Sequence, residues 1–259
     1  MGTKNGTRPQ FLFHVFFFSV FAFLPEQNAE KNLQRLLKEY FPSAKELRVN
    51  ISAPFFKLAF GKINRVDIVA ENAEFLGLRV EKLTLHVYNL HFPPLKSFVK
   101  NQFRVSSFKE GKAQFVITEK DMEVYLRKRA SAKISNLKLT FKKNAFVLEG
   151  NMDMYEGIIL PSFRLEGNAV VEGGERIVLK IPKAKFTVIP IPGFLVDFIM
   201  EDINPVFNLR DAERELAIFK ELQNFLGKPI KTELKSVTLK DGKVVCEASG
   251  YPEKSKEKK

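Results

Sequence analysis

The sequence predicts an α+β fold in which long antiparallel strands dominate and short helices interrupt them. Runs of alternating apolar and polar residues meet at turn dipeptides such as Gly173-Gly174 and Asp241-Gly242, which is typical of β-hairpins. Several runs reach about ten residues or more, whereas an ordinary strand has about 5–6. Long, strongly twisted strands curl, so we expect a highly curved sheet.

One amphipathic helix is predicted before the first strand, over Glu26–Phe41. Its apolar residues recur at the three- and four-residue spacing of a helix with one buried face, and Pro42 ends it. The residues of this stripe are Leu33, Leu36, Leu37, Tyr40 and Phe41.

The first predicted hairpin turns at Leu76-Gly77. Leu78 and Val80 fall out of phase with the residues that follow them, so we predict a bulge near Glu81-Lys82. The in-phase apolar positions of the two strands are Val66, Ile68 and Ala70, then Leu83, Leu85 and Val87.

Three further hairpins are predicted, and short helices separate the strand pairs. The turns lie at Lys143-Asn144, Gly173-Gly174 and Asp241-Gly242. The accessory helices are expected at Pro54–Phe60, Pro93–Asn101, Thr118–Lys128 (capped by Thr118) and Gly193–Phe207.

The amino terminus has the pattern of a secretory signal. Lys4 and Arg8 precede the apolar run Phe11–Leu24, which is shorter than the about 20 residues that a membrane-spanning helix needs. An uncleaved anchor or a buried core helix is the alternative. We therefore divide the chain into a signal segment (1–24), a single domain (26–250) and a disordered charged tail (251–259).

Net charge and aromatic content favour a lipid partner. The net charge is +12, which suits nucleic acid or anionic lipid, and an exported protein meets lipid rather than nucleic acid. The chain has 26 Phe and no Trp, which favours apolar surfaces that carry no hydrogen-bonding group. A solvated surface rich in Lys and Glu would also explain the charge.

No catalytic or metal-binding pattern is present, so we expect neither enzymatic activity nor a cofactor. His86 and His91 lie five apart on one predicted strand, where their side chains point to opposite faces and cannot share a metal. The single cysteine, Cys246, lies in an apolar strand pattern and is expected to be a core residue.

Apolar side chains are therefore the candidate functional residues, because they could line or close a lipid-accommodating cavity or dip into a headgroup layer. Packing as ordinary core is the alternative. The candidates are Leu33, Leu37, Phe55, Phe56, Phe60, Val66, Ile68, Leu83, Leu85, Val87, Phe194, Leu195 and Phe198, with Lys57 and Lys62 expected to attract phosphate headgroups.

The run from Pro54 to Leu90 resembles the LmeA-type phospholipid-binding proteins. It contains an apolar turn, the strand GKINRVD, and then GLRVEKL followed by another strand, while Leu234–Gly250 (LKSVTLKDGKVVCEASG) is similar to the closing hairpin of that family. The resemblance implies a non-enzymatic cell-envelope protein that binds phospholipid. It also implies a TULIP-like fold, with the curved sheet wrapped around the N-terminal helix. The charged segment Leu209–Gln223 is longer than the family pattern leads us to expect.

The leading hypothesis is an exported phospholipid binder that carries or senses lipid in the periplasm or another extracytoplasmic part of the cell envelope. Its expected partners are phospholipid, anionic in particular, and the membrane surface. The alternatives are a structural envelope protein with a solid core and an envelope enzyme acting on lipid or glycan. A binder needs a continuous inward-facing cavity, whereas a structural protein would be close-packed.

Overall fold

The computed structural model describes residues 26–75, 77–93, 105–130, 134–155, 158–186, 189–190, 192–215, 223–224, 226 and 229–253. Three of the predictions concern residues outside this part of the chain. They are the signal segment (1–24), almost all of the helix expected at Pro93–Asn101, and residues 254–259 of the tail.

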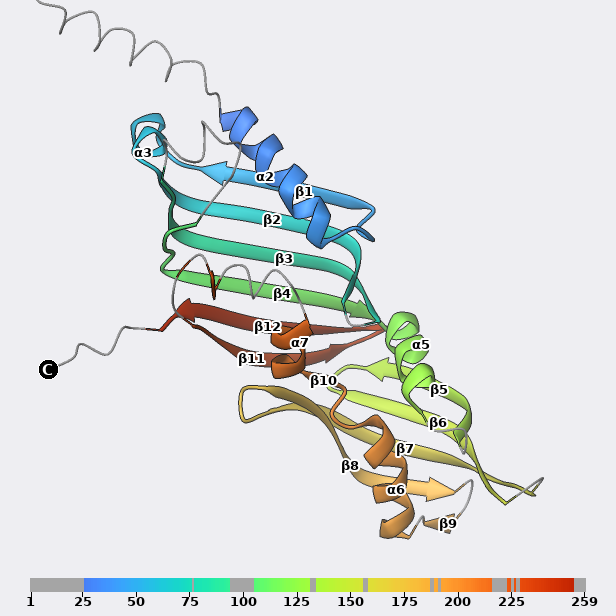
Figure 1. Cartoon of the computed structure of the whole chain (residues 1–259). Helices are drawn as coiled ribbons and strands as arrows, with labels where there is room; N and C mark the ends of the chain where they lie inside the picture. The colour runs from blue at the N-terminus through green and yellow to red at the C-terminus, as the bar shows by residue number, and fades with distance from the viewer. Residues whose placement is uncertain are drawn as a thin grey trace, which may run out of the picture.

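The strands form two antiparallel sheets that lie one after the other along the molecule (Figure 1). The first sheet has the order β1 (Glu46–Ser52), β2 (Lys62–Phe75), β3 (Leu78–His91), β4 (Glu110–Thr118), β12 (Lys243–Pro252) and β11 (Ile230–Lys240). The second has β5 (Ile134–Lys142), β6 (Ala145–Tyr155), β7 (Ile158–Glu172) and β8 (Arg176–Phe186), with the short strands β9 (Ile189–Pro190) and β10 (Phe207–Asn208) both paired to β8.

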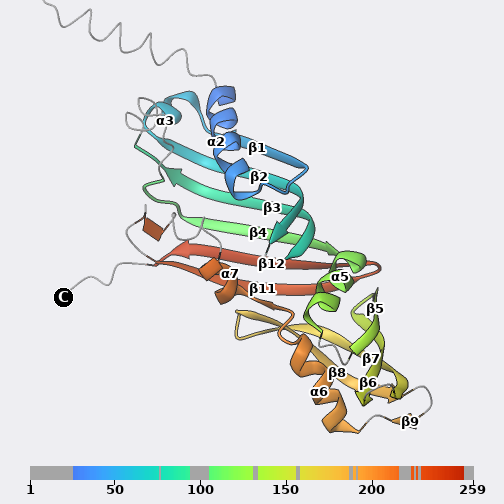
Figure 2. The same ribbon diagram turned by 45° about the vertical axis from the view of Figure 1, so that its right-hand side comes forward.

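The strands are accompanied by α2 (Glu26–Tyr40), α3 (Phe55–Ala59), α5 (Glu119–Arg129), α6 (Gly193–Ile203) and α7 (Leu209–Glu215), and residues 223–224 and 226 are also helical. Helix α2 lies against β1, and α3 follows β1 at one end of the first sheet. Figure 2 shows α5 beside the junction of the sheets and α6 against the second sheet, at the far end of the molecule from α3.

The predicted hairpins and their turns are confirmed. Gly77, Asn144, Gly173, Gly174 and Gly242 all have positive φ, which tight turns between strands require and which glycine and asparagine tolerate best. The cap of α5 is confirmed as well, because Thr118 Oγ1 accepts a hydrogen bond from the backbone N–H of Asp121 at 3.1 Å.

The mostly β, antiparallel and strongly curled architecture agrees with the predicted α+β class, but the strands form two sheets where one was expected. The sheets meet at β11. The backbone N–H of Leu234 donates to the carbonyl of Gly174 at 2.7 Å, and that of Asn144 donates to the carbonyl of Leu239 at 3.1 Å. One cluster of buried apolar side chains runs through both sheets.

The prediction of a bulge near Glu81-Lys82 is wrong. The register of β2 and β3 is the same on both sides of this point, from Lys62↔His91 to Phe75↔Leu78. Both strands instead change their buried face at the same place, since Ala70 and Ala73 are both buried on β2 and Val80 and Leu83 are both buried on β3. A change made together by both partners needs no extra residue in either strand.

Two predicted boundaries also shift. Helix α6 ends at Ile203 instead of Phe207, because Pro205 disfavours helical geometry at Asn204 and the chain then enters β10. Strand β12 continues through Tyr251 and Pro252, which the sequence assigned to the tail and which pair with Lys231 and Ile230.

Candidate functional site

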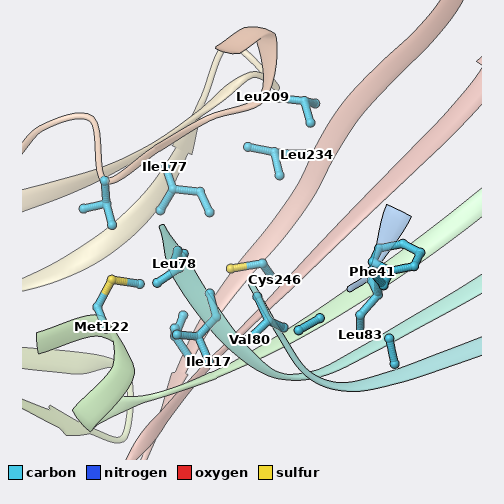
Figure 3. Close-up of a cluster of buried hydrophobic side chains, with 14 of the residues drawn as sticks. Phe41, Leu78, Val80, Leu83, Ile117, Met122, Ile177, Leu209, Leu234 and Cys246 are labelled. Carbon is cyan, nitrogen blue, oxygen red and sulfur yellow. The ribbon is translucent and has the colours of Figure 1, made fainter. Parts of the chain in front are cut away.

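A cavity with a volume of about 820 Å³ is bounded by both sheets. Its lining comes from α2 and from β2, β3, β4, β11 and β12 of the first sheet, and from α5, β5, β7 and β8 on the other side. Figure 3 shows side chains from these distant segments converging, among them Leu83, Ile117, Ile177, Leu234 and Cys246. A volume of this size is within the usual range of ligand pockets, about 300–1,000 Å³.

Strand alternation explains why the lining is apolar. On β3, Leu83, Leu85 and Val87 line the cavity, while the residues between them, Thr84 and His86, lie on the other face of the strand. The neighbouring strands repeat this pattern, with Ala113 and Phe115 on β4 and Cys246 and Ala248 on β12. Because the strands are long, their inward faces together form an extended apolar wall.

Three phenylalanines form an aromatic row along the wall. The rings of Phe41 and Phe75 meet edge to face at 5.5 Å between centroids and 71°, and those of Phe75 and Phe115 at 6.2 Å and 88°. All three rings line the cavity. The contacts link the segment after α2 to β2 and β4 and hold the row in one arrangement.

Few lining residues carry polar side-chain atoms: Glu39, Tyr40, Thr232, Cys246 and Ser249. Thr232 is buried and donates its hydroxyl hydrogen to Glu213 on α7. A cavity with this chemistry suits hydrocarbon, with a few polar positions that could contact a headgroup.

Helix α7 lies beside the cavity and is fixed by charged groups. Leu209 and Ala212 belong to the lining, while Arg210 donates to Glu175 at 2.5 Å and to Glu213 at 3.1 Å. The hydrogen bond from Arg210 outweighs burial and holds the pKa of Glu175 below its usual range. The charged residues of this segment thus attach a helix whose apolar side completes the wall.

Cys246 is buried within the lining, as predicted from its strand pattern. Burial raises the pKa of its thiol to about 12. The side chain therefore stays a neutral, apolar thiol at physiological pH, which makes it an unreactive part of the wall.

The structure brings seven of the predicted site residues together in the cavity lining: Leu33, Leu37, Val66, Ile68, Leu83, Leu85 and Val87. Their contact with lipid remains a prediction.

The other predicted residues whose side chains the structure describes do not line the cavity. Phe56 and Phe60 are 61% and 74% exposed on and beside α3, where Lys57 and Lys62 also lie. The side chain of Phe55 is outside the described residues. On α6, Phe194 is 69% exposed, whereas Leu195 and Phe198 are half-buried against the core.

Sequence reasoning missed the contributions of β4, β11, β12 and α7 to the lining. The sequence could have predicted the inward-facing residues of the last hairpin, because this hairpin repeats the apolar–polar alternation of the first one. These residues include Val237, Val244 and Ala248. The role of α7 had no such signal, since its sequence reads as a charged, solvated segment.

The outer face of the first sheet carries a polar cluster away from the cavity. Asp67 Oδ1 lies 2.5 Å from Arg65 Nε and 2.5 Å from His86 Nδ1. Burial opposes ionisation of Asp67, but hydrogen bonds from Arg65 and His86 outweigh it and lower the pKa of this carboxyl.

The two histidines of the first hairpin have different partners. His86 contacts Asp67, whereas His91 Nδ1 lies 3.2 Å from Ser107 Oγ. Within the described ranges, no group of three His, Cys, Asp or Glu side chains could hold a metal ion. Nor is any helix of the described residues long and apolar enough to cross a membrane.

Comparison with known proteins agrees with this apolar site. Residues 20–249 match the LmeA family, described as LmeA-like phospholipid-binding. No curated protein and no solved structure matches the chain. Because the family match extends over nearly the whole sequence, the chain belongs to the LmeA-like phospholipid-binding family.

Proposed function

We propose that this chain is an exported, non-catalytic protein that carries phospholipid in the cell envelope with the acyl chains inside the cavity. The observation that supports the proposal most is the continuous apolar lining shared by both sheets. Each CH₂ group transferred from water into such a lining contributes about 0.8 kcal/mol. Two acyl chains would therefore provide a large free energy of binding without any specific polar contact.

The headgroup is expected at the end of the cavity where the polar lining residues Thr232 and Ser249 lie, close to the ends of β11 and β12. A net charge of +12 favours anionic phospholipid and an anionic membrane surface as partners. Helix α2 supplies Leu33 and Leu37 to the lining, and we expect the curved first sheet to close around it, in the TULIP-like manner, when lipid is bound.

Two other functions fit the site less well. A structural envelope protein would be expected to have a close-packed core, and a cavity of about 820 Å³ argues against close packing. An envelope enzyme would need a nucleophile or an acid–base pair facing its substrate. Cys246, the lining thiol, has its pKa raised far from neutrality.

Native mass spectrometry of the full chain, expressed with its signal segment and purified from the exported fraction, tests the proposal. We expect a species heavier than the polypeptide by the mass of one or more phospholipids. Tandem dissociation should release the lipid and identify its headgroup. If the protein carries no phospholipid and cannot be loaded from vesicles, the carrier function is wrong. Recovery of all the protein from the cytoplasm would contradict the proposed export but not the proposed lipid binding.

A further inference from the structure

One edge of the first sheet gathers features that the cavity does not explain. We call it the α3 edge. It consists of helix α3 and the strand ends at Ser52, Lys62, His91, Glu110, Ile230 and Pro252, which the strand pairing places together. Figure 1 shows α3 at this edge, beside the ends of β1 and β2, whereas the two sheets meet along β11.

Two large aromatic side chains project from the α3 edge. Leu58 is buried and holds α3 on the sheet, whereas Phe56 and Phe60 are 61% and 74% exposed. The N–H of Phe60 donates to the carbonyl of Phe56 at 3.3 Å, so the two residues are one helical turn apart. A single exposed apolar side chain needs no explanation, but two neighbouring exposed rings on a helix of five residues form a small apolar projection.

Lysines flank the two rings. Lys57 lies between them in the sequence, and Lys62 begins β2 just beyond them. In the described part of the chain, Lys57 Nζ donates to the amide oxygen of Asn64 at 3.2 Å instead of to a carboxylate, so its charge is not neutralised there. Exposed aromatic rings beside free cations suit the interface of an anionic membrane, where the rings enter the headgroup layer and the lysines contact phosphate.

The second exposed phenylalanine site lies at the opposite end of the molecule and has the opposite charge. Phe194 on α6 is 69% exposed, but that helix contains Asp197, Glu201 and Asp202 and no basic residue. An anionic surface would repel these carboxylates. Charge therefore distinguishes the two apolar ends, and only the α3 end suits an anionic bilayer.

The chain also enters and leaves the domain at the α3 edge. Glu30, in the first turns of α2, accepts a hydrogen bond from the N–H of Ile51 at 2.8 Å, which places the beginning of α2 beside the end of β1. The apolar run Phe11–Leu24 directly precedes α2 in the sequence. At the other terminus, the N–H of Glu253 donates to Pro229 at 3.0 Å, and the sequence continues with four lysines in Lys254–Lys259.

From these observations the geometry points to the α3 edge as the surface that docks onto an anionic phospholipid membrane. The aromatic projection, the flanking lysines, the beginning of α2 and the end of β12 all lie at this edge. The cavity lining reaches this edge through Leu90, Gly111, Ile230 and Gly250. Docking there brings one end of the cavity to the bilayer. The inference rests on the proposed function, which names an anionic membrane surface as a partner, and it assigns the part of the chain that contacts that surface, outside the cavity.

Single tryptophans test the orientation, since the chain has none of its own. Phe60→Trp and Phe194→Trp are matched variants, each placing an indole at a well-exposed phenylalanine, one at each end. Each full-length variant is mixed with vesicles of phosphatidylglycerol and phosphatidylcholine, with or without brominated acyl chains. We expect the emission of the indole at position 60 to shift to shorter wavelength and to be quenched by the brominated lipid. The indole at position 194 should show neither change.

Three results would overturn the inference. The first is an indole at position 60 that stays solvent-exposed in the presence of vesicles, and the second is quenching at position 194 instead. The third is a blue shift at position 60 that grows with protein concentration without vesicles, which would identify a second copy as the occupant of the edge. Phe56→Trp repeats the test if Phe60→Trp does not fold. Phospholipid cargo in native mass spectra is a separate readout, so failure of docking and failure of the carrier function are distinguishable.

Discussion

The carboxylate of Glu30 accepts a hydrogen bond from the backbone N–H of Ile51 at 2.8 Å. This contact joins the first turns of α2 to the end of the edge strand β1, shortly before α3 begins. Gln34, one turn further on, donates in the opposite direction, from its side-chain amide to the backbone carbonyl of Leu47. The helix is therefore attached along an edge strand by polar groups, while Leu33 and Leu37 face the cavity.

Replacing Glu30 tests this attachment. Glu30→Ala leaves the half-buried N–H of Ile51 without its acceptor, and we expect the free energy of unfolding to fall by about 1–2 kcal/mol. Glu30→Gln keeps a carbonyl acceptor and should lose less than half of that amount. Urea denaturation of the two variants measures the difference, and equal losses would mean that the hydrogen bond is not what matters.

The Asp67 cluster predicts an acid dependence of stability. The pKa of the Asp67 carboxyl is lower in the folded state than the ordinary value of about 3.9. The ionised carboxyl therefore stabilises the folded state above that pH, and this contribution is lost as the pH falls through the lowered pKa. Asp67→Asn should lower the free energy of unfolding at neutral pH and flatten its decline in acid. Asp197→Asn, at an exposed site, is the control, and identical acid profiles for Asp67→Asn and wild type would contradict the assignment.

Cys246 should be inert while the protein is folded. With a thiol pKa of about 12, only about one part in ten thousand is thiolate at pH 8, and burial blocks access as well. A negatively charged disulfide reagent should label the thiol only after denaturation. Gln114→Cys, on the exposed face of β4, provides a reactive thiol for comparison. Rapid labelling of native wild-type protein would show that the wall opens readily.

Gly167 on β7 lies close against the backbone of the neighbouring strand β8. A Cβ at this position would lie 2.0 Å from the carbonyl oxygen of Lys180, at the register shift between β7 and β8. We expect Gly167→Ala to lower the free energy of unfolding by about 1–3 kcal/mol or more. Gly193→Ala, where a Cβ would meet nothing within 4 Å, should have little effect in the same denaturation measurement.

The hairpins were predictable because alternation and turn residues act locally. Asp241-Gly242 and the flanking alternation define β11 and β12 without knowledge of any other segment. The same local signal identified the cavity side of β2 and β3, including Val66 and Leu85. Pattern alone therefore assigned the inward faces of strands.

The partition into two sheets was not predictable, because it depends on pairing between segments far apart in the sequence. β4 pairs with β12 through residues such as Gln114 and Glu247, and no local pattern specifies that partner. Exposure of Phe56 and Phe194 was also hidden, since a stripe of apolar residues does not reveal whether another element covers it.

The central claim is that the cavity holds phospholipid, and two directly paired alanines offer the sharpest test. Ala113 on β4 and Ala248 on β12 are partners across the ladder, and both line the cavity. The next pair, Gln114 and Glu247, lies on the exposed outer face of the same strands. Phenylalanines at the inner pair would fill the cavity, whereas phenylalanines at the outer pair would leave it unchanged.

The measurement is the number of phospholipids bound per protein molecule, determined by native mass spectrometry for Ala113→Phe/Ala248→Phe and for Gln114→Phe/Glu247→Phe. Both variants are first shown by urea denaturation to be folded. We predict that the inner variant loses most of its bound phospholipid and that the outer variant keeps the wild-type amount. Equal phospholipid content in the two folded variants would contradict the placement of lipid in the cavity.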